Sequence, residues 1–275
     1  ADAARLLFLP ELMLTGHGGH AKMTENAEPV PDGPMSRAIL DMSRDAGICI
    51  SVGIAELTRD IVYNSQMVVD RGEYLGLQRK INMSSDEYLW FGVGESLELF
   101  DIGDVRFVNI ICYDNHFAEL ALAAGLLDAE LILAPHAARS GKWPDELTAE
   151  FKRERIRSLQ EEWQKLHQTR ARDHNVFVLL NNAVGSSVMG LDTLDGYDHF
   201  GPGGLDQRRA IANHSGTVMG FNPKGETILR TQVDDFVDEI RTVELHADQR
   251  QQNFGVTRNR RRDTMMRILD DATGG

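Results

Sequence analysis

Short apolar runs of strand length recur along this chain, and amphipathic helical patterns lie between them. The runs are rich in valine, isoleucine, leucine and phenylalanine, which favour strands. Strands interspersed with helices predict a layered α/β protein. The predicted strands are Leu6–Leu9, Ile48–Ile54, Ile61–Val69, Glu73–Leu77, Val105–Cys112, Glu130–Leu133, Val176–Leu180, Thr217–Phe221, Thr227–Arg230 and Glu239–Leu245.

Turn sequences indicate that the sheets are not purely parallel. The stretches DRGE at 70–73 and NPKGE at 222–226 each separate two strand-like runs, which predicts two hairpins. Helices are predicted over Pro34–Ala46, Phe117–Leu127, Glu146 to about His174, and Thr264–Asp271. The longest has one apolar stripe, formed by Ile156, Leu159, Trp163 and Leu166. Because no linker is evident, residues 1–275 are expected to form a single domain.

The composition excludes several classes of partner and location. A chain of 275 residues with 42% hydrophobic residues can bury a sizeable core. Its formal net charge of −13 argues against a nucleic-acid partner or an anionic membrane surface, because both attract positive proteins. Two cysteines do not make a disulfide framework, and no apolar stretch approaches the roughly 20 residues of a membrane-spanning helix. The cytoplasm is therefore the expected location.

Three predicted strands run into a reactive or charged residue. LLFLPE ends at Glu11, GLQRK ends at Lys80 and FVNIIC ends at Cys112. Each feature alone has an ordinary explanation, since a glutamate or a lysine is usually solvated and a strand-end cysteine usually packs in the core. Together they supply a base, a cation and a nucleophile, which is the set that acyl transfer requires.

These three residues lie in sequence blocks that resemble the nitrilase superfamily, the carbon–nitrogen hydrolases. The blocks are FLPELMLTG at 8–16, YNSQMVVDRGEYLGLQRK at 63–80 and CYDNHFAEL at 112–120. Two later stretches, TRARDHNVFVLLNNAVG at 169–185 and SGTVMGFNPKGETIL at 215–229, are similar to later strands of the family. The resemblance implies a four-layer α-β-β-α sandwich, a homodimer, and a catalytic triad of Glu11, Lys80 and Cys112.

The resemblance also implies further site residues. The family often has a second glutamate before an aromatic-rich turn, and EYLWFGVG at 87–94 makes Glu87 the candidate, with Glu95 as the rival. Lys80 and the backbone N–H of Tyr113 are expected to bind the oxyanion. The ammonium and the helix after Cys112 would favour the thiolate, and a closed cleft would raise the pKa of the general base Glu11.

The expected reaction is hydrolysis of a non-peptide amide or carbamoyl bond of a small molecule, with linear amides as the expected class. It passes through a thioester and releases ammonia or an amine, without a metal or an organic cofactor. Asn82 replaces a histidine that is frequent in the family, and Asn115 replaces the arginine of carbamoyl-amino-acid hydrolases. CYD favours an amidase over a nitrile hydrolase, which usually has Trp-Glu after the cysteine. Residues 137–151 and 186–214 are expected to form loops at the rim. Candidate substrate contacts are Asn115, His116, His136, Asn182, His199 and Phe200.

Alternatives remain at this point. His17 and His20 lie in a Gly-rich loop that could suggest a metal site, but they lack further ligands at recognisable spacing. Rival functions are a nitrile hydrolase, an acyltransferase, an ammonia-supplying glutamine amidase, and a non-catalytic relative that binds an amide. The family generally begins with a strand and a helix ahead of the glutamate block. Both are expected to be missing here, so we expect the chain to be N-terminally incomplete.

Overall fold

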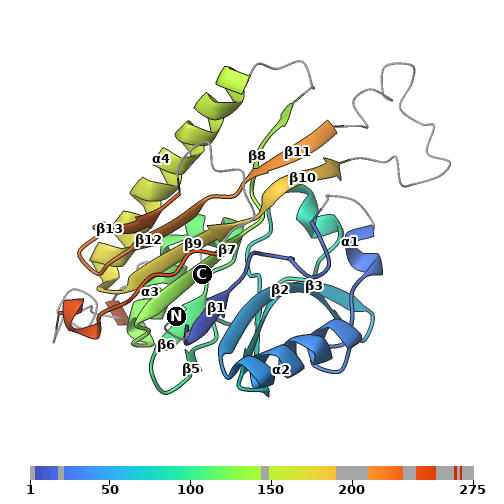
Figure 1. Ribbon diagram of the computed structural model, residues 1–275, viewed down its shortest axis with the longest axis horizontal. Coiled ribbons are helices and arrows are strands. Elements are labelled where there is room, and N and C mark those ends of the chain that lie inside the picture. Colours follow the sequence, from blue (N-terminus) through green and yellow to red (C-terminus); the bar gives the residue numbers. More distant parts are fainter. Residues whose placement is uncertain are drawn as a thin grey trace.

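The computed structural model describes residues 4–17, 22–143, 149–189, 210–231, 240–251, 263, 264 and 267. The first sheet has four strands in the order β1-β2-β3-β4, of which Figure 1 labels β1, β2 and β3. Its only parallel pair among these strands is β1 with β2, where Leu7 lies opposite Ile50. The predicted hairpin at 70–73 is confirmed as the β3–β4 connection. The bounds are β1 (Leu6–Phe8), β2 (Cys49–Thr58), β3 (Ile61–Asp70) and β4 (Glu73–Arg79).

A second, six-stranded sheet has the order β13-β12-β9-β7-β6-β5. Strands β6, β7 and β9 are parallel neighbours at its centre, and the remaining pairs are antiparallel. The predicted hairpin at 222–226 joins β12 to β13. The bounds are β5 (Phe100–Asp101), β6 (Arg106–Asn109), β7 (Leu131–His136), β9 (Phe177–Asn182), β12 (Val218–Phe221) and β13 (Thr227–Arg230).

The third sheet is antiparallel, with the order β10-β11-β8. Its strands are β8 (Arg139–Trp143), β10 (Val184–Met189) and β11 (Ala210–Ser215). Strand β8 lies in the segment 137–151, and most of β10 and β11 lies in the segment 186–214. Both segments were predicted to be loops, so that prediction is wrong where these strands form. The sequences RSGKW, VGSSVM and AIANHS contain small and polar residues in place of an alternating apolar pattern, which explains why they were not recognised.

The long helices agree with the helical patterns. Helix α2 (Pro34–Ala46) ends at Gly47, which has a left-handed φ of 67°, as expected of a C-cap glycine. Helix α3 (Ala118–Leu126) is one residue shorter at each end than predicted, and α4 (Ala149–His174) lies beside it in Figure 1. The short helices are α1 (Lys22–Glu25) and the 3-10 helices η1 (Ser85–Leu89), η2 (Cys112–His116) and η4 (Ala247–Gln249).

Three apolar clusters hold these layers together. Ile50, Val52 and Met67 of the first sheet pack with Ile39 of α2. The other face of this sheet contributes Val68, which packs with Phe107, Leu133 and Phe177 of the six-stranded sheet. The opposite face of the six-stranded sheet packs against α3 and α4 through residues that include Ile132, Val178, Ala124 and Trp163. The mixed α/β class is confirmed, and the complete four-layer sandwich stays a prediction.

Two other predicted elements differ from the structure. Residues 240–245 form no strand, because this segment has no ladder partner among the described residues; the prediction of a strand at Glu239–Leu245 is wrong there. The strand predicted at Val105–Cys112 ends at Asn109. Most of the helix predicted at Thr264–Asp271 lies outside the described residues. In the part of the chain that is described, no helix is both long and apolar enough to cross a bilayer.

Candidate active site

Lys80 lies at the centre of a buried group of charged side chains. It follows β4 directly, and its backbone is fixed on both sides, since its N–H donates to the carbonyl of Asn64 and its carbonyl accepts from Gly94. The side chain is 1% exposed. Its ammonium nitrogen lies 2.8 Å from Oε1 of Glu11 and 2.8 Å from both carboxylate oxygens of Glu87. The structure therefore brings together three of the four predicted catalytic side chains.

Glu11 is held in a tight turn after β1. Leu12 has a left-handed φ of 49°, and the turn lies directly against Gly53 of β2, whose N–H donates to the carbonyl of Pro10. A Cβ atom on Gly53 would lie 2.1 Å from the nitrogen of Leu12, so the turn requires glycine there. The carboxylate also accepts from the Asn64 side chain at 2.8 Å and from the N–H of Ala137 at 2.8 Å. Each carboxylate oxygen of Glu11 thus has a defined donor.

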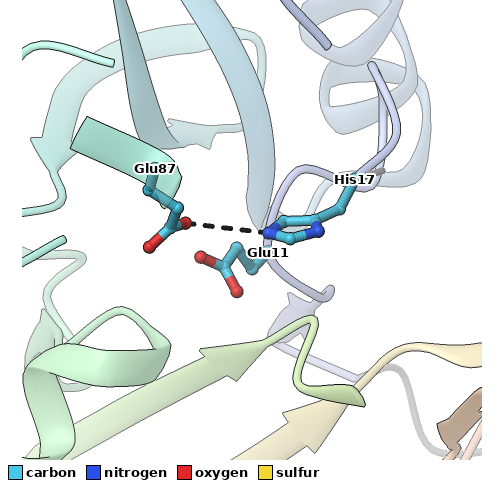
Figure 2. A group of neighbouring side chains, drawn as sticks. All are labelled: Glu11, His17 and Glu87. Atoms are coloured by element: carbon cyan, nitrogen blue, oxygen red, sulfur yellow. Dashed lines mark ion pairs between the residues drawn. The ribbon is translucent and has the colours of Figure 1, made fainter. Parts of the chain in front are cut away.

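Glu87 is fixed by a capping box at the start of η1. Both the N–H and the hydroxyl of Ser84 donate to Oε2 of Glu87, at 2.8 and 2.7 Å. Oε1 lies 3.7 Å from Nε2 of His17, and Figure 2 shows the imidazole directed toward the carboxylates of Glu11 and Glu87. The rival Glu95 is exposed, whereas Glu87 is 2% exposed. The contacts with Lys80 therefore favour Glu87 over Glu95.

Cys112 begins the 3-10 helix η2, three residues after β6 ends. Its φ of 48° is uncommon for a residue with a side chain, and such strain concentrates at functional sites. The side-chain amide of Asn115 donates to the carbonyls of Ile110 and Cys112, at 2.7 and 3.0 Å, and so holds this turn from inside. The α-helix predicted after the cysteine, α3, begins only at Ala118, and its effect on the thiol stays a prediction.

The charges define the resting state of the site. Burial lowers the pKa of Lys80, but Glu11 and Glu87 outweigh it and raise the pKa overall, so the ammonium stays charged. Burial raises the pKa of Glu11, but Lys80 outweighs it and lowers the pKa overall, which overturns the expected increase. For Cys112, burial and the carboxylate of Glu11 raise the pKa well above its usual value, although Lys80 opposes them. The resting site thus holds ionised carboxylates and a protonated thiol.

Glu11, His17 and Glu87 could also be considered as metal ligands, since one ligand atom from each lies within 4.8 Å of the others. Two carboxylates and an imidazole would suit a divalent transition metal. However, the Lys80 ammonium already lies between the two carboxylates at 2.8 Å from each. A divalent cation at this place would face that ammonium at close range, so the donor set fits an ion triad better than a metal site.

The other predicted site residues have these places. Tyr113 and His116 are exposed and their rings lie 5.2 Å apart. His136 is buried beside Trp163, and burial lowers its pKa to about 3, so it is neutral. Asn182 is also buried, and it exchanges hydrogen bonds with the backbone of Ala138. Their contacts with substrate stay predictions.

Three of the histidine and aromatic candidates, His20, His199 and Phe200, lie outside the described residues.

Sequence reasoning missed two buried polar residues of the site. Asn64 is 1% exposed on β3 and contacts Glu11, as well as Glu87 at 3.4 Å. Asp114 is 1% exposed and contacts the chain just after Lys80. The signal for Asn64 was the polar stretch NSQ inside an otherwise apolar strand. Asp114 gave no signal, because its partners are more than 30 residues away in sequence.

Comparison with known proteins identifies the family. Residues 1–252 match the carbon–nitrogen hydrolase family, so the chain belongs to that family and the predicted membership of the nitrilase superfamily is confirmed. A nitrilase from Pyrococcus abyssi is 34% identical over 49% of this chain and 52% of its own length. An N-carbamoylputrescine amidase from Solanum lycopersicum is 26% identical over 88% of this chain and 75% of its own.

The chain spans about half the length of the curated relatives that it matches at 34% and 33% identity. Among solved structures, the amidase from Nesterenkonia sp. AN1 covers 96% of this chain with 83% of its own length, at a TM-score of 0.67 and 18% identity. That structure is a mutant with covalent addition of the acetamide moiety of fluoroacetamide at its active-site cysteine. A carbon–nitrogen hydrolase from Helicobacter pylori covers 83% of this chain with 73% of its own, at a TM-score of 0.66 and 17% identity.

Proposed function

We propose that this chain hydrolyses the carbon–nitrogen bond of a small linear amide through a thioester on Cys112. The observation that carries the proposal is the Lys80 ammonium at 2.8 Å from both Glu11 and Glu87, beside a thiol whose pKa depends on both Glu11 and Lys80. An unactivated amide requires a strong nucleophile and stabilisation of the oxyanion, and this group supplies both. Membership of the carbon–nitrogen hydrolase family adds support.

Acylation begins with proton transfer from the Cys112 thiol to the ionised carboxylate of Glu11. The sulfur forms a bond to the amide carbon, and the carbonyl electron pair moves onto the oxygen. Because one ammonium hydrogen can serve the two equidistant oxygens of Glu87 and a second serves Glu11, the third is directed at the oxyanion. The backbone N–H of Tyr113 is the second proposed oxyanion donor. The carbon–nitrogen bond then breaks, and Glu11 returns its proton to the leaving ammonia or amine.

Deacylation uses the same groups in reverse. Glu11, again ionised, removes a proton from water as the oxygen attacks the thioester carbon. The carbon–sulfur bond breaks, the acid leaves and the sulfur takes the proton back from Glu11. Burial raises the pKa of Glu87, but the hydrogen bonds with His17 and Lys80 outweigh burial and lower the pKa overall. Glu87 therefore stays ionised, and in this scheme it does not exchange a proton. Its proposed role is to hold the ammonium in place.

Cysteine replacement tests the proposal. Cys112→Ala is expected to abolish release of ammonia in a screen of aliphatic amides, carbamoyl amino acids and ω-amides. Wild type, quenched during turnover, should carry an acyl adduct on the peptide that contains Cys112. Cys49→Ala is the matched control, because Cys49 is fully buried and its pKa is raised to about 12, chiefly by burial. Turnover that persists in Cys112→Ala would overturn the proposal, whereas an amine acceptor that competes with water for the acyl group at low concentration would indicate a transferase.

A further inference from the structure

Asp114 connects the nucleophile turn with the chain that carries Lys80. It lies two residues after Cys112 and is 1% exposed. Its Oδ2 accepts the N–H of Ile81 at 3.1 Å, and its Oδ1 accepts the N–H of Asn82 at 2.6 Å and the Asn82 side-chain amide at 2.9 Å. One carboxylate thus receives three hydrogen bonds from the two residues that follow Lys80.

We propose that Asp114 is a positioning residue, whose ionised carboxylate fixes the distance between the Cys112 thiol and the Lys80 ammonium. This inference rests on the proposed function, because it assigns Asp114 a role in the same site. The contact is the direct link between the two segments: Ile81 is bonded covalently to Lys80, and Asp114 belongs to the turn that starts at Cys112. The ionised form accepts all three hydrogens without conflict, whereas protonation would place an O–H donor next to the N–H groups that the carboxylate faces.

The charge of Asp114 is costly for the fold, which favours a role in the site. Burial raises its pKa to about 6, although the hydrogen bonds from Asn82 and Ile81 and the charge of Lys80 oppose that increase. A folded-state pKa above the unfolded value means that the folded chain holds the proton more tightly, so its stability falls as the pH rises from about 4 to about 6. The charge of Lys80 acts on Asp114 in the opposite direction to burial. At neutral pH the ionised carboxylate is therefore kept at the expense of stability.

Asp114→Asn is the sharpest test, because it preserves the shape of the side chain. The amide oxygen can still accept from Asn82, but the NH2 group then faces the N–H of Ile81, and two donors repel each other. The end of β4 with Lys80 is expected to move away from the Cys112 turn. Asp60→Asn is the matched control, because Asp60 is exposed in the turn between β2 and β3.

The readout is the rate of iodoacetamide alkylation of Cys112 at pH 8, followed by mass spectrometry of its peptide. Loss of the nearby ammonium would raise the pKa of the thiol and slow alkylation about fourfold for each unit of pKa, since a tenfold smaller thiolate fraction is partly offset by higher nucleophilicity. Simple removal of a negative charge would lower that pKa and make alkylation faster. The sign of the change therefore separates positioning from a plain charge effect.

We expect Asp114→Asn to slow alkylation about fourfold or more and to lower kcat about tenfold, with KM nearly unchanged. Asn82→Ala removes only one of the three donors, so its effect should be smaller and in the same direction. It also supplies the test if Asp114→Asn does not fold. Alkylation that is unchanged or faster in both variants would overturn the inference. Alkylation needs no substrate, so a wild type that alkylates as expected but turns over no amide would sink the proposed function alone.

Discussion

Asn64 donates its side-chain amide to Oε1 of Glu11 at 2.8 Å, the same oxygen that receives the Lys80 ammonium. A donor to the ionised form of a carboxylate lowers its pKa. Asn64→Ala should therefore raise the pKa of Glu11. Because the base must be ionised, the acid limb of kcat/KM should move to higher pH. Asn109→Ala is the control, since Asn109 is equally buried but contacts Ser51. An equal movement of the limb in both variants would contradict the prediction.

Glu87→Gln should impair catalysis much more than Glu95→Gln. The amide loses the charge that holds the Lys80 ammonium at 2.8 Å, and it cannot accept from both Ser84 donors and Lys80 as the carboxylate does. We expect kcat to fall about 10²-fold, the loss typical when one oxyanion donor is displaced. Glu95 is exposed, so its variant should retain the wild-type rate. Steady-state kinetics on the best amide of the screen would check this prediction. A larger effect for Glu95→Gln would make Glu95 the second glutamate of the site.

Gly53→Ala should displace Glu11 without a change in any charged group. The added Cβ would lie 2.6 Å from the carbonyl carbon of Glu11 and 2.1 Å from the nitrogen of Leu12, and this backbone cannot move aside cheaply. We expect a loss of about 1–3 kcal/mol in the free energy of unfolding and a severe loss of kcat. Gly103→Ala is the control: its φ of 83° is strained for alanine, but nothing lies within 4 Å. It should lose stability and keep its activity, and a Gly53→Ala variant that does the same would refute the prediction.

Arg79→Gln should make the fold more sensitive to acid. Arg79 binds Glu56 at 2.8 Å, and although burial raises the pKa of Glu56, the hydrogen bonds from Arg79, Thr58 and Ser65 lower it overall. A depressed folded-state pKa contributes stability at neutral pH, and this contribution is lost as the pH falls through that pKa.

Without Arg79, urea unfolding at pH 7 should show a loss of about 1–2 kcal/mol, reduced from the roughly 3–5 of a fully buried pair because Arg79 is 36% exposed. The acid-unfolding midpoint should move to higher pH. Arg37→Gln breaks only a 4.0 Å pair that is mostly exposed, and should change neither value appreciably. A midpoint that stays in place for Arg79→Gln would show that Glu56 does not depend on this partner.

The sequence predicted those parts of the protein whose determinants are local. The bounds of α2 agree with the prediction residue for residue, because Pro34 can begin a helix and Gly47 can end one in the left-handed region. The hairpin at 70–73 was equally readable. The strands β8, β10 and β11 were not, because their sequences lack the alternating apolar pattern of a half-buried strand.

The residues of the candidate site likewise fall into those that the sequence predicted and those that it did not. Glu11, Lys80 and Cys112 were selected as strand-end residues and, together with Glu87, by resemblance. Asn64 and Asp114, which contact the site from other segments, were not predicted. The left-handed φ of Cys112 and the contact of Asp114 with Ile81 depend on how those segments meet, which periodicity does not encode. The homodimer, the cytoplasmic location and the single domain over residues 1–275 stay predictions.

The N–H of Ala137 donates a hydrogen bond to Glu11, the proposed base. Because Ala137 follows β7 and Glu11 follows β1, this bond links the two sheets. Any sliding of one sheet along the other pulls on that carboxylate. A substitution at Val68 or Phe107, in the apolar layer between the sheets, is therefore expected to lower kcat although neither side chain contacts the catalytic groups through a polar atom. The kcat of such variants would report whether the two sheets keep their relative position.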